Sequence, residues 1–412
     1  MTDPAASAAY DVAVVGGGMV GATLAVALGE RGFRVALVEA RAPERNWPDD
    51  SHDLRVSAIT HASQAVFERL GAWPAMVAAG VTPYRAMQVW DAPGFGEIRF
   101  EAAELGEPDL GHIIENRVIQ AALWGRLEAL GEAVRVICPA GVSGLEPAAD
   151  AGVRRLWLDG HEPLSAALVV AADGARSRVR DLAGLAVEGR PYDQTAVVAT
   201  VRPAHGHGET AWQRFMADGP LALLPLGEGL FSIVWSTSSA HADELLGASD
   251  AAFGAALTQA SEGRVGDIVP VGPRAAFPLR LQRATAYVLP GIALVGDAAH
   301  VIHPLAGQGV NLGILDAAAL VDVLVEARSA RRRPGALATL RRYERARKGE
   351  NLGVQYAMDG FKRVFGNALP PVRLVRNLGL RAANDIGPLK RLFARIALGS
   401  LGDLPTLARP GG

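Results

Sequence analysis

The chain has 412 residues, of which 50% are hydrophobic, and its formal net charge at pH 7 is −2. This length is sufficient for two or three domains with a sizeable core, and a charge so near zero gives no basis for a nucleic-acid partner. The single cysteine, Cys138, excludes an intrachain disulfide; we interpret it as a buried, inert thiol in a reducing compartment. The sequence shows no secretory leader and no apolar run of membrane-spanning length, which predicts a cytoplasmic protein.

A strand, a helix and a second strand are predicted at the start of the chain. Tyr10–Val15 is a short apolar run typical of a buried parallel strand. Residues 22–31 are rich in Ala and Leu and predict a helix that Gly32 ends, and residues 33–38 predict the second strand. This order of elements is that of a dinucleotide-binding unit.

Three glycines and one acid in this unit are candidate cofactor-binding residues. Gly16, Gly18 and Gly21 have G-x-G-x-x-G spacing, which permits a tight turn, approach of a pyrophosphate and close packing of helix on strand. The helix N-terminus then offers free N–H groups to the phosphates. Glu39 ends the second strand, where a carboxylate accepts hydrogen bonds from ribose hydroxyls. The complete context favours a nucleotide site over a plain glycine-rich turn.

The next segment carries a cation whose role the sequence leaves open. Residues 40–51 predict a loop, and residues 53–60 lead into a helix predicted over 63–70. Arg55, near the start of that helix, is either a solvated surface arginine or a cation beside a flavin or its phosphates. Further along, the alternating pattern of residues 84–100 predicts a pair of strands.

A second motif follows a predicted helix over 117–130, a strand over 134–138 and a hairpin with a return strand over 155–170. The return strand ends at Asp173, where open α/β sheets bind their ligands. Arg176 and Arg178 come directly after it, so the loop either faces an anion or is a solvated turn.

Residues 192–285 predict an antiparallel sheet inserted into the nucleotide-binding part. Strands are expected at 196–201, 211–215, 221–226 and 230–236, with Gly and Pro turns between them. Their aromatic residues are mostly core, and one face of the sheet is left to line an apolar pocket. These aromatics are Trp212, Phe215, Phe231 and Trp235.

The third motif spans residues 291–313. A buried strand ends at Asp297, a turn rich in Pro and Gly follows, and a helix is predicted over 310–324. The glycines let the backbone lie flat against a ring system, and the helix N-terminus offers N–H groups to an oxygen anion. His300 is expected to be a structural histidine, whereas His303 beside Pro304 is a candidate for the lining of a ring pocket.

The C-terminal part is basic. Residues 327–348 predict a helix with a solvated face, and residues 361–397 again set Lys and Arg among apolar side chains. Residues 361–397 are either a helical cap docked by its apolar side or a basic amphipathic surface for anionic lipid or a partner.

These motifs, in this order, resemble the ubiquinone-biosynthesis FAD-dependent hydroxylase family, within the flavoprotein aromatic hydroxylases related to para-hydroxybenzoate hydroxylase. The resemblance lies in residues 53–60, 110–120, 213–226 and 296–313, with Tyr343, Arg347, Asn351, Asp359 and Asn384 near the C-terminus. The segment 115–117 and the third motif are more specific than the glycine fingerprint, which many flavoproteins share.

The resemblance implies an α/β fold in which a Rossmann-like FAD-binding domain carries an inserted antiparallel-sheet substrate domain and a C-terminal helical segment. The FAD-binding domain would comprise residues 1–80, 106–190 and 286–330. The substrate domain would comprise residues 81–105 and 191–285, and the C-terminal helical region residues 331–412.

The resemblance also implies a tightly held FAD, with NAD(P)H as a transient reductant because only one complete dinucleotide fingerprint is present. The residues implied to bind FAD are Gly16, Gly18, Gly21, Glu39, Arg55, Arg117, Gln120, Asp173, Asp297, Pro304, Gly307, Gly309, Val310 and Asn311. His303 is the catalytic candidate, and no metal site is expected.

The implied reaction is hydroxylation of the ring of a polyprenylated phenol with O₂. Two alternatives stay open: hydroxylation of a small soluble aromatic compound, and a non-catalytic flavoprotein scaffold in a biosynthetic complex. Other ubiquinone-biosynthesis proteins are candidate partners, and contact of residues 361–397 with the inner membrane would make the protein peripheral.

Overall fold

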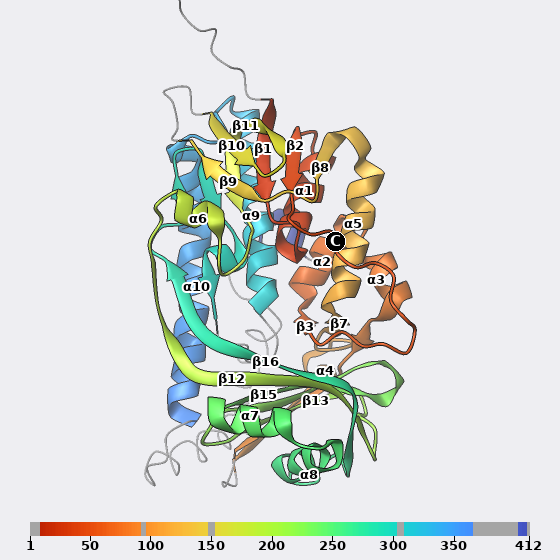
Figure 1. The fold of residues 1–412 in the computed structure, drawn as a ribbon. Helices are drawn as coiled ribbons and strands as arrows, with labels where there is room; N and C mark the ends of the chain where they lie inside the picture. Colours follow the sequence, from red (N-terminus) through yellow and green to blue (C-terminus); the bar gives the residue numbers. More distant parts are fainter. Residues whose placement is uncertain (1–8, 92–95, 147–152, 303–308, 366–402, 410–412) are drawn as a thin grey trace, which may run out of the picture.

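The structure is a computed structural model that describes residues 9–91, 96–146, 153–302, 309–365 and 403–409. It has two large sheets, one in the upper half of Figure 1 with helices packed around it and one crossing the lower half. This arrangement confirms the α/β fold class expected from the sequence.

The upper sheet has the strand order β17-β18-β11-β1-β2-β8, and the five strands from β18 to β8 run parallel. Its fully buried strands are the near-continuous apolar runs that a doubly covered parallel sheet requires. β9 and β10 add an antiparallel meander on β11. The bounds are β1 Tyr10–Val15, β2 Val35–Val38, β8 Val134–Ile137, β9 Val142–Leu145, β10 Arg154–Leu158, β11 His161–Ala171, β17 Val288–Leu289 and β18 Ile292–Leu294.

Helices cover this sheet, with α1 packed against both α5 and α9, and α10 packed on α9. The helix after the glycine turn, expected over 22–31, spans Met19–Glu30 in the structure. The bounds are α1 Met19–Glu30, α2 His61–Arg69, α3 Trp73–Gly80, α4 Ala102–Leu105, α5 Asn116–Leu130, α6 Arg178–Leu182, α9 Gly309–Ser329 and α10 Leu337–Phe365, with short 3₁₀ turns at Gly131–Ala133, Gly227–Gly229, Gly296–Ala298 and Thr406–Ala408.

A small three-stranded sheet links the two halves. β3 (Val56–Ile59) and β4 (Thr82–Pro83) pair antiparallel with β7 (His112–Glu115). From the sequence, residues 53–60 were expected to lead directly into a helix, so β3 was missed. The strand exists because its partner β7 lies far along the chain, which a local pattern does not show.

The lower sheet has the order β19-β16-β12-β15-β14-β13-β5-β6 and is antiparallel except for the β13–β5 pair. All four predicted strands of the insertion are present, and the predicted pair at residues 84–100 joins the same sheet. The bounds are β5 Ala86–Asp91, β6 Glu97–Glu101, β12 Val187–Pro203, β13 Thr210–Phe215, β14 Leu221–Pro225, β15 Phe231–Thr237, β16 Ile268–Ala284 and β19 His300–Val301.

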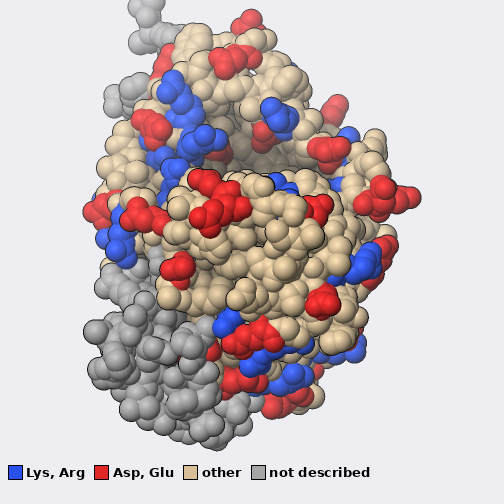
Figure 2. All heavy atoms as spheres, turned by 60° about the horizontal axis from the view of Figure 1, so that its bottom comes forward, with Lys and Arg blue, Asp and Glu red and all other residues tan. Residues whose placement is uncertain are grey.

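Two helices that the sequence patterns did not predict, α7 (Ser239–Gly247) and α8 (Asp250–Ala260), cover the outer face of the lower sheet. Trp235 and Phe231 of β15 point into this outer core together with Phe253 of α8. In Figure 2 the α7–α8 end of the molecule faces the viewer and presents a broad area of uncharged surface.

Alternate residues of the same strands form an inner face, which is turned toward the upper half. Ala211 and Leu224 of this face pack against Tyr84, Leu110 and Ile113. Of the aromatics noted in the sequence, Phe215 alone lies on the inner face.

The sequence led to two expectations about membranes, one on membrane-spanning segments and one on residues 361–397. Within the described ranges, no helix is both long enough and apolar enough to pass through a bilayer. Residues 361–365 continue α10, and the remainder of the predicted amphipathic segment, 366–397, lies outside the described residues.

Candidate flavin site

The first and second motifs meet where β1 and β11 run side by side. Gly16 has φ +102°, and a Cβ at this position would lie 2.4 Å from the Ala172 carbonyl oxygen. A Cβ at Gly21 would lie 1.9 Å from the Gly16 carbonyl oxygen. Both positions therefore require glycine, and the Asp173 turn lies directly beside the glycine turn.

The first and third motifs meet at Val20, in the first turn of α1. A Cβ at Gly313 of α9 would lie 2.6 Å from Val20 Cγ2, and a Cβ at Gly296 would lie 3.3 Å from the same atom. Gly313 and Gly296 thus let α9 and the third motif approach α1 closely. All three motifs converge around the N-terminal end of α1.

The other side of the glycine turn is held by Glu39 and by α5. The Gly17 N–H donates to Glu39 Oε2 at 2.5 Å, and Trp124 Nε1 donates to the Gly17 carbonyl at 2.8 Å. Gln120 Nε2 lies 3.9 Å from the position of a Cβ on Gly18. Trp124 was missed from the sequence, although its spacing from Gln120 and Arg117 places all three on one face of α5.

A pyrophosphate fits the N-terminus of α1. Gly18 is the N-cap residue, no side chain caps the helix, and its first turn holds no acidic residue. The 3.9 Å contact with Gln120 is the nearest that a Gly18 Cβ would make. Free N–H groups, a favourable dipole and open space are what an anion requires at such a site.

Asp173 has one carboxylate oxygen available for a ligand. Oδ2 accepts from the Val179 N–H at 3.1 Å, whereas the buried Oδ1 has no partner among the described residues. Burial raises the pKa of this carboxyl. Arg176 and Arg178 are exposed on the turn that follows.

Asp297 follows β18 in the short turn Gly296–Ala298, and its side chain accepts no hydrogen bond from the described residues. The side chain is exposed, yet desolvation by the surrounding protein raises the pKa of its carboxyl, against the lowering influence of His300 and Arg55. Accessibility combined with partial desolvation is expected for a carboxylate in a concave site. Figure 2 shows a hollow between the broad uncharged surface and the upper half of the molecule.

The two arginines differ in their surroundings. Arg55 is exposed, with its guanidinium carbon 5.7 Å from the ring centroid of Phe277, on the inner face of the lower sheet. Arg117 donates to Ser51 and Glu115 and stacks on Trp47 at 4.6 Å. In this structure Arg117 therefore fastens the 47–53 loop.

At the start of α9, Asn311 ties the helix to β3. Its Oδ1 accepts from the Thr60 N–H at 3.2 Å, and its Nδ2 donates to the Ala58 carbonyl at 2.7 Å. Gly309 and Val310 begin the helix beside it. His303, Pro304 and Gly307 lie outside the described residues.

His300 is a structural histidine, as predicted. It is 2% exposed, and its Nε2 lies 2.6 Å from Asp316 Oδ2. Among the described residues, no cluster of His, Cys, Asp and Glu has an arrangement that would hold a metal ion. Cys138 is half-buried, and burial raises the pKa of its thiol.

Sequence comparison places the chain among flavoproteins. Residues 9–352 match the model of a family described as FAD binding domain. The chain is 42% identical to 3-demethoxyubiquinol 3-hydroxylase of Escherichia coli K12, over 94% of this chain and 98% of the relative. It is 39% identical to the ubiquinone hydroxylase UbiL of Rhodospirillum rubrum, with 95% and 90% covered, and 34% identical to the human ubiquinone biosynthesis monooxygenase COQ6, with 94% and 92% covered.

Solved structures share the fold at lower identity. The p-nitrophenol 4-monooxygenase PnpA of Pseudomonas putida DLL-E4 superposes with a TM-score of 0.75 at 19% identity, covering 96% of this chain and 99% of PnpA. An HpxO variant of Klebsiella pneumoniae complexed with FAD gives a TM-score of 0.71 at 18% identity, covering 95% and 99%. With three motifs converging around the N-terminus of α1 and relatives of this identity over nearly the whole chain, this protein is an FAD-dependent monooxygenase that belongs to the ubiquinone-biosynthesis hydroxylase family.

Proposed function

We propose that the chain hydroxylates the aromatic ring of a polyprenylated phenol in ubiquinone biosynthesis, using NAD(P)H and O₂. The observation that carries this proposal is the inner face of the lower sheet, which is turned toward the flavin-binding half. Its side chains are mostly apolar, with the buried polar residues Gln213, Ser232 and Ser236 among them. The names of the relatives, a demethoxyubiquinol hydroxylase among them, support the same substrate class.

The inner face is built by strand alternation. Val198 of β12, Val234 of β15 and Ala222 of β14 lie side by side in the register and point away from the α7–α8 core. Phe215 of β13 and the half-exposed Phe277 of β16 extend the apolar surface. Such a wall favours an apolar substrate and keeps bulk water from the site of oxygen transfer, which limits loss of reducing equivalents as peroxide.

We propose a role in FAD binding for each of the candidate residues of the converging motifs. We assign the ADP half of FAD to Gly16, Gly18, Gly21 and Glu39. We assign Asp173 to the pyrophosphate region because its turn lies directly beside the glycine turn. When bound, FAD supplies the reduction of O₂ and the transfer of one oxygen atom.

The remaining assignments concern the ring end of the coenzyme. Asp297 would accept from the ribityl hydroxyls, Arg55, Arg117 and Gln120 would lie along the flavin and pyrophosphate, and Pro304, Gly307, Gly309, Val310 and Asn311 would bracket the ring. His303 is the first acid–base candidate. We retain the division into an FAD-binding domain, a substrate domain and a C-terminal helical region with the boundaries given above.

The substrate class is tested by coupling. NAD(P)H oxidation by the purified holoprotein should accelerate more with a prenylated phenol than with hydroxybenzoate, and mass spectrometry should find the prenylated ring one oxygen heavier. The opposite order of substrates favours the small-aromatic alternative. Bound FAD with neither NAD(P)H oxidation nor any oxygenated product favours the scaffold. Expression in strains that lack each ring hydroxylation step then identifies the position attacked.

A substrate with a lipid tail would reside in a membrane, which suggests where this protein works. We propose a cytoplasmic protein that contacts the inner membrane peripherally through residues 361–397. Neutralising Arg391 and Arg395 should reduce co-sedimentation of the full chain with anionic liposomes. An unchanged fraction in the pellet supports the docked cap instead.

A further inference from the structure

A buried polar cluster lies behind the third motif. Asp316, on α9, is 0% exposed and accepts four hydrogen bonds. The donors are the Gly296 N–H at 3.1 Å, His300 Nε2 at 2.6 Å, Arg347 Nε at 2.9 Å and Asn351 Nδ2 at 3.0 Å.

These donors keep the carboxylate charged. Burial by itself would raise the pKa of Asp316, but His300, Arg347 and Asn351 outweigh it and lower the pKa to about 2. Buried ion pairs of this kind stabilise a fold little compared with apolar packing, because desolvating both charges is costly. A cluster with every partner in place does, however, fix one geometry.

The geometry that Asp316 fixes is that of the turn bearing Asp297. Its Oδ2 bonds the residue directly before Asp297 and also His300, three residues after it. The turn is therefore held from behind at both ends. Asp297 is exposed on the opposite side of this turn, and its side chain accepts no hydrogen bond from the described residues.

The helix α10 completes the arrangement from the far side. Arg347 is 2% exposed and Asn351 0%, and the two side chains also bond each other at 3.0 Å. Tyr343, one turn earlier, donates to the Leu294 carbonyl in the last residue of β18 at 2.8 Å. Three residues of α10 thus contact either Asp316 or the strand that leads into the Asp297 turn.

We propose that Asp316 is a positioning residue for the coenzyme, acting through the Gly296–His300 turn, and that Arg347 and Asn351 hold it from α10. The proposal rests on the role assigned above to Asp297. It extends the flavin site to α10, which packs on α9, and it gives a specific task to the C-terminal helical region.

The test compares Asp316→Asn with Asp322→Asn, a matched substitution on the same helix. Asp322 accepts a hydrogen bond from the Thr406 N–H at 2.7 Å, away from the Asp297 turn. FAD is titrated into each apoprotein by fluorescence, and the visible spectrum of bound flavin and the melting temperature of the apoprotein are recorded. Asp316→Asn should weaken FAD binding roughly tenfold or more and shift the flavin spectrum, because charge-assisted bonds to the turn are lost. Asp322→Asn should leave both unchanged.

A merely structural role predicts a different pattern. Leu320→Ala, at a fully buried apolar position of α9, should lower the melting temperature while leaving FAD affinity and spectrum near those of the parent. If Asp316→Asn does no more than Leu320→Ala, the proposal is overturned. Asn351→Ser removes one donor to Asp316 and the acceptor of the Arg347 Nη2 bond, and it should weaken FAD binding by a few fold. This milder variant decides the question if Asp316→Asn does not fold.

The Asp297→Asn variant distinguishes the positioning role proposed for Asp316 from the FAD-binding role proposed for Asp297. Weaker FAD binding in Asp297→Asn together with parental binding in Asp316→Asn and Asn351→Ser overturns the positioning role alone. Parental binding in Asp297→Asn overturns the assignment of Asp297 and the positioning role together.

Discussion

The indole N–H of Trp124 donates a 2.8 Å hydrogen bond to the carbonyl oxygen of Gly17 in the glycine turn. Since Trp124 is 6% exposed, its removal leaves a carbonyl with little access to water. The bond therefore ties α5 to the glycine turn, where we propose that the pyrophosphate binds.

Trp124→Phe should weaken FAD binding about fivefold, since a single hydrogen bond contributes about 1 kcal/mol. Fluorescence titration of the apoprotein measures this change. The control is Trp157→Phe, because Trp157 is 44% exposed on β10 and donates to Glu146 away from the site. Equal FAD affinities of the two variants would contradict a role for Trp124 in the turn.

The three fingerprint glycines should respond differently to substitution. A Cβ at Gly21 meets the Gly16 carbonyl at 1.9 Å, so Gly21→Ala should prevent folding. Gly18 has φ −67° and a 3.9 Å nearest contact, so Gly18→Glu should fold but purify without yellow colour. Absorbance at visible wavelengths and far-UV circular dichroism separate the two outcomes.

Gly125 supplies the control for these glycines. It lies inside α5, and a Cβ added there would meet open space, so Gly125→Ala should retain FAD and raise the melting temperature slightly. Flavin retained in Gly18→Glu would show that the pyrophosphate binds elsewhere.

These contrasts explain which parts of the site could be predicted from the sequence. The glycine spacing and the acid after the second strand are local, so Gly16, Gly21 and Glu39 were found together with their elements. Trp124 and Asp316 act through contacts with residues far along the chain, and neither belongs to a recognisable motif. For the same reason β3 was missed, as was β16, which pairs with the distant β12, while the four strands predicted between residues 196 and 236 are present.

The pair His61–Asp109 should make stability depend on pH. His61 Nε2 lies 2.7 Å from Asp109 Oδ1, and this bond raises the pKa of His61 above its ordinary 6.5 despite desolvation. The stabilisation is complete below pH 6.5 and is lost as the pH rises through the folded-state pKa. Burial lowers the pKa of neighbouring His112, which works in the opposite direction, so the wild type alone does not isolate the pair.

The His61→Gln variant isolates the contribution of the His61–Asp109 pair to stability. The difference in free energy of unfolding between wild type and His61→Gln, from urea titrations, should be largest near about pH 5.5 and shrink toward about pH 8.5. The exposed His161, which bonds the uncharged Pro139 carbonyl, serves as the control position for the same substitution. A difference for His61→Gln that does not change with pH would rule out the ion pair.

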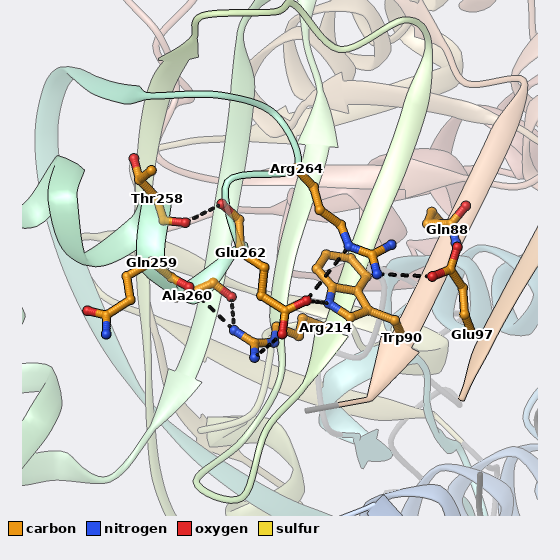
Figure 3. Close-up of polar contacts among 10 residues, drawn as sticks. Gln88, Trp90, Glu97, Arg214, Thr258, Gln259, Ala260, Glu262 and Arg264 are labelled. Carbon is orange, nitrogen blue, oxygen red and sulfur yellow. Dashed lines mark hydrogen bonds and ion pairs between the residues drawn. The ribbon is translucent and has the colours of Figure 1, made fainter. Parts of the chain in front are cut away.

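Glu262 should act as a clamp on the edge of the lower sheet (Figure 3). It accepts from Trp90 Nε1 at 3.1 Å and from Arg214 Nη2 at 2.6 Å, which joins the parallel neighbours β5 and β13. Arg264 stacks on Trp90 at 4.5 Å and pairs with Glu97 of β6 at 3.0 Å. The cluster connects residues 81–105 to the rest of the sheet.

Glu262→Gln should lower the free energy of unfolding by about 1–2 kcal/mol, because the largely buried Arg214 loses its carboxylate partner. FAD affinity should not change, since the cluster belongs to the lower sheet. A double-mutant cycle with Trp90→Phe measures the coupling between the two side chains. Additive effects would show that the bond between them contributes nothing.

The strands β12 and β16 form a long paired ribbon between the upper and lower halves of the molecule (Figure 1). They are paired from Val187–Ala284 to Pro203–Ile268, and the ladder is interrupted between Pro191 and Thr195 and between Ala199 and Thr200. A double-stranded ribbon bends less readily than two single connecting loops, and Asp193, with φ +53°, lies inside the interruption between Pro191 and Thr195. A rotation of one half against the other would therefore have to bend two paired strands together, which a connection through single loops would not require.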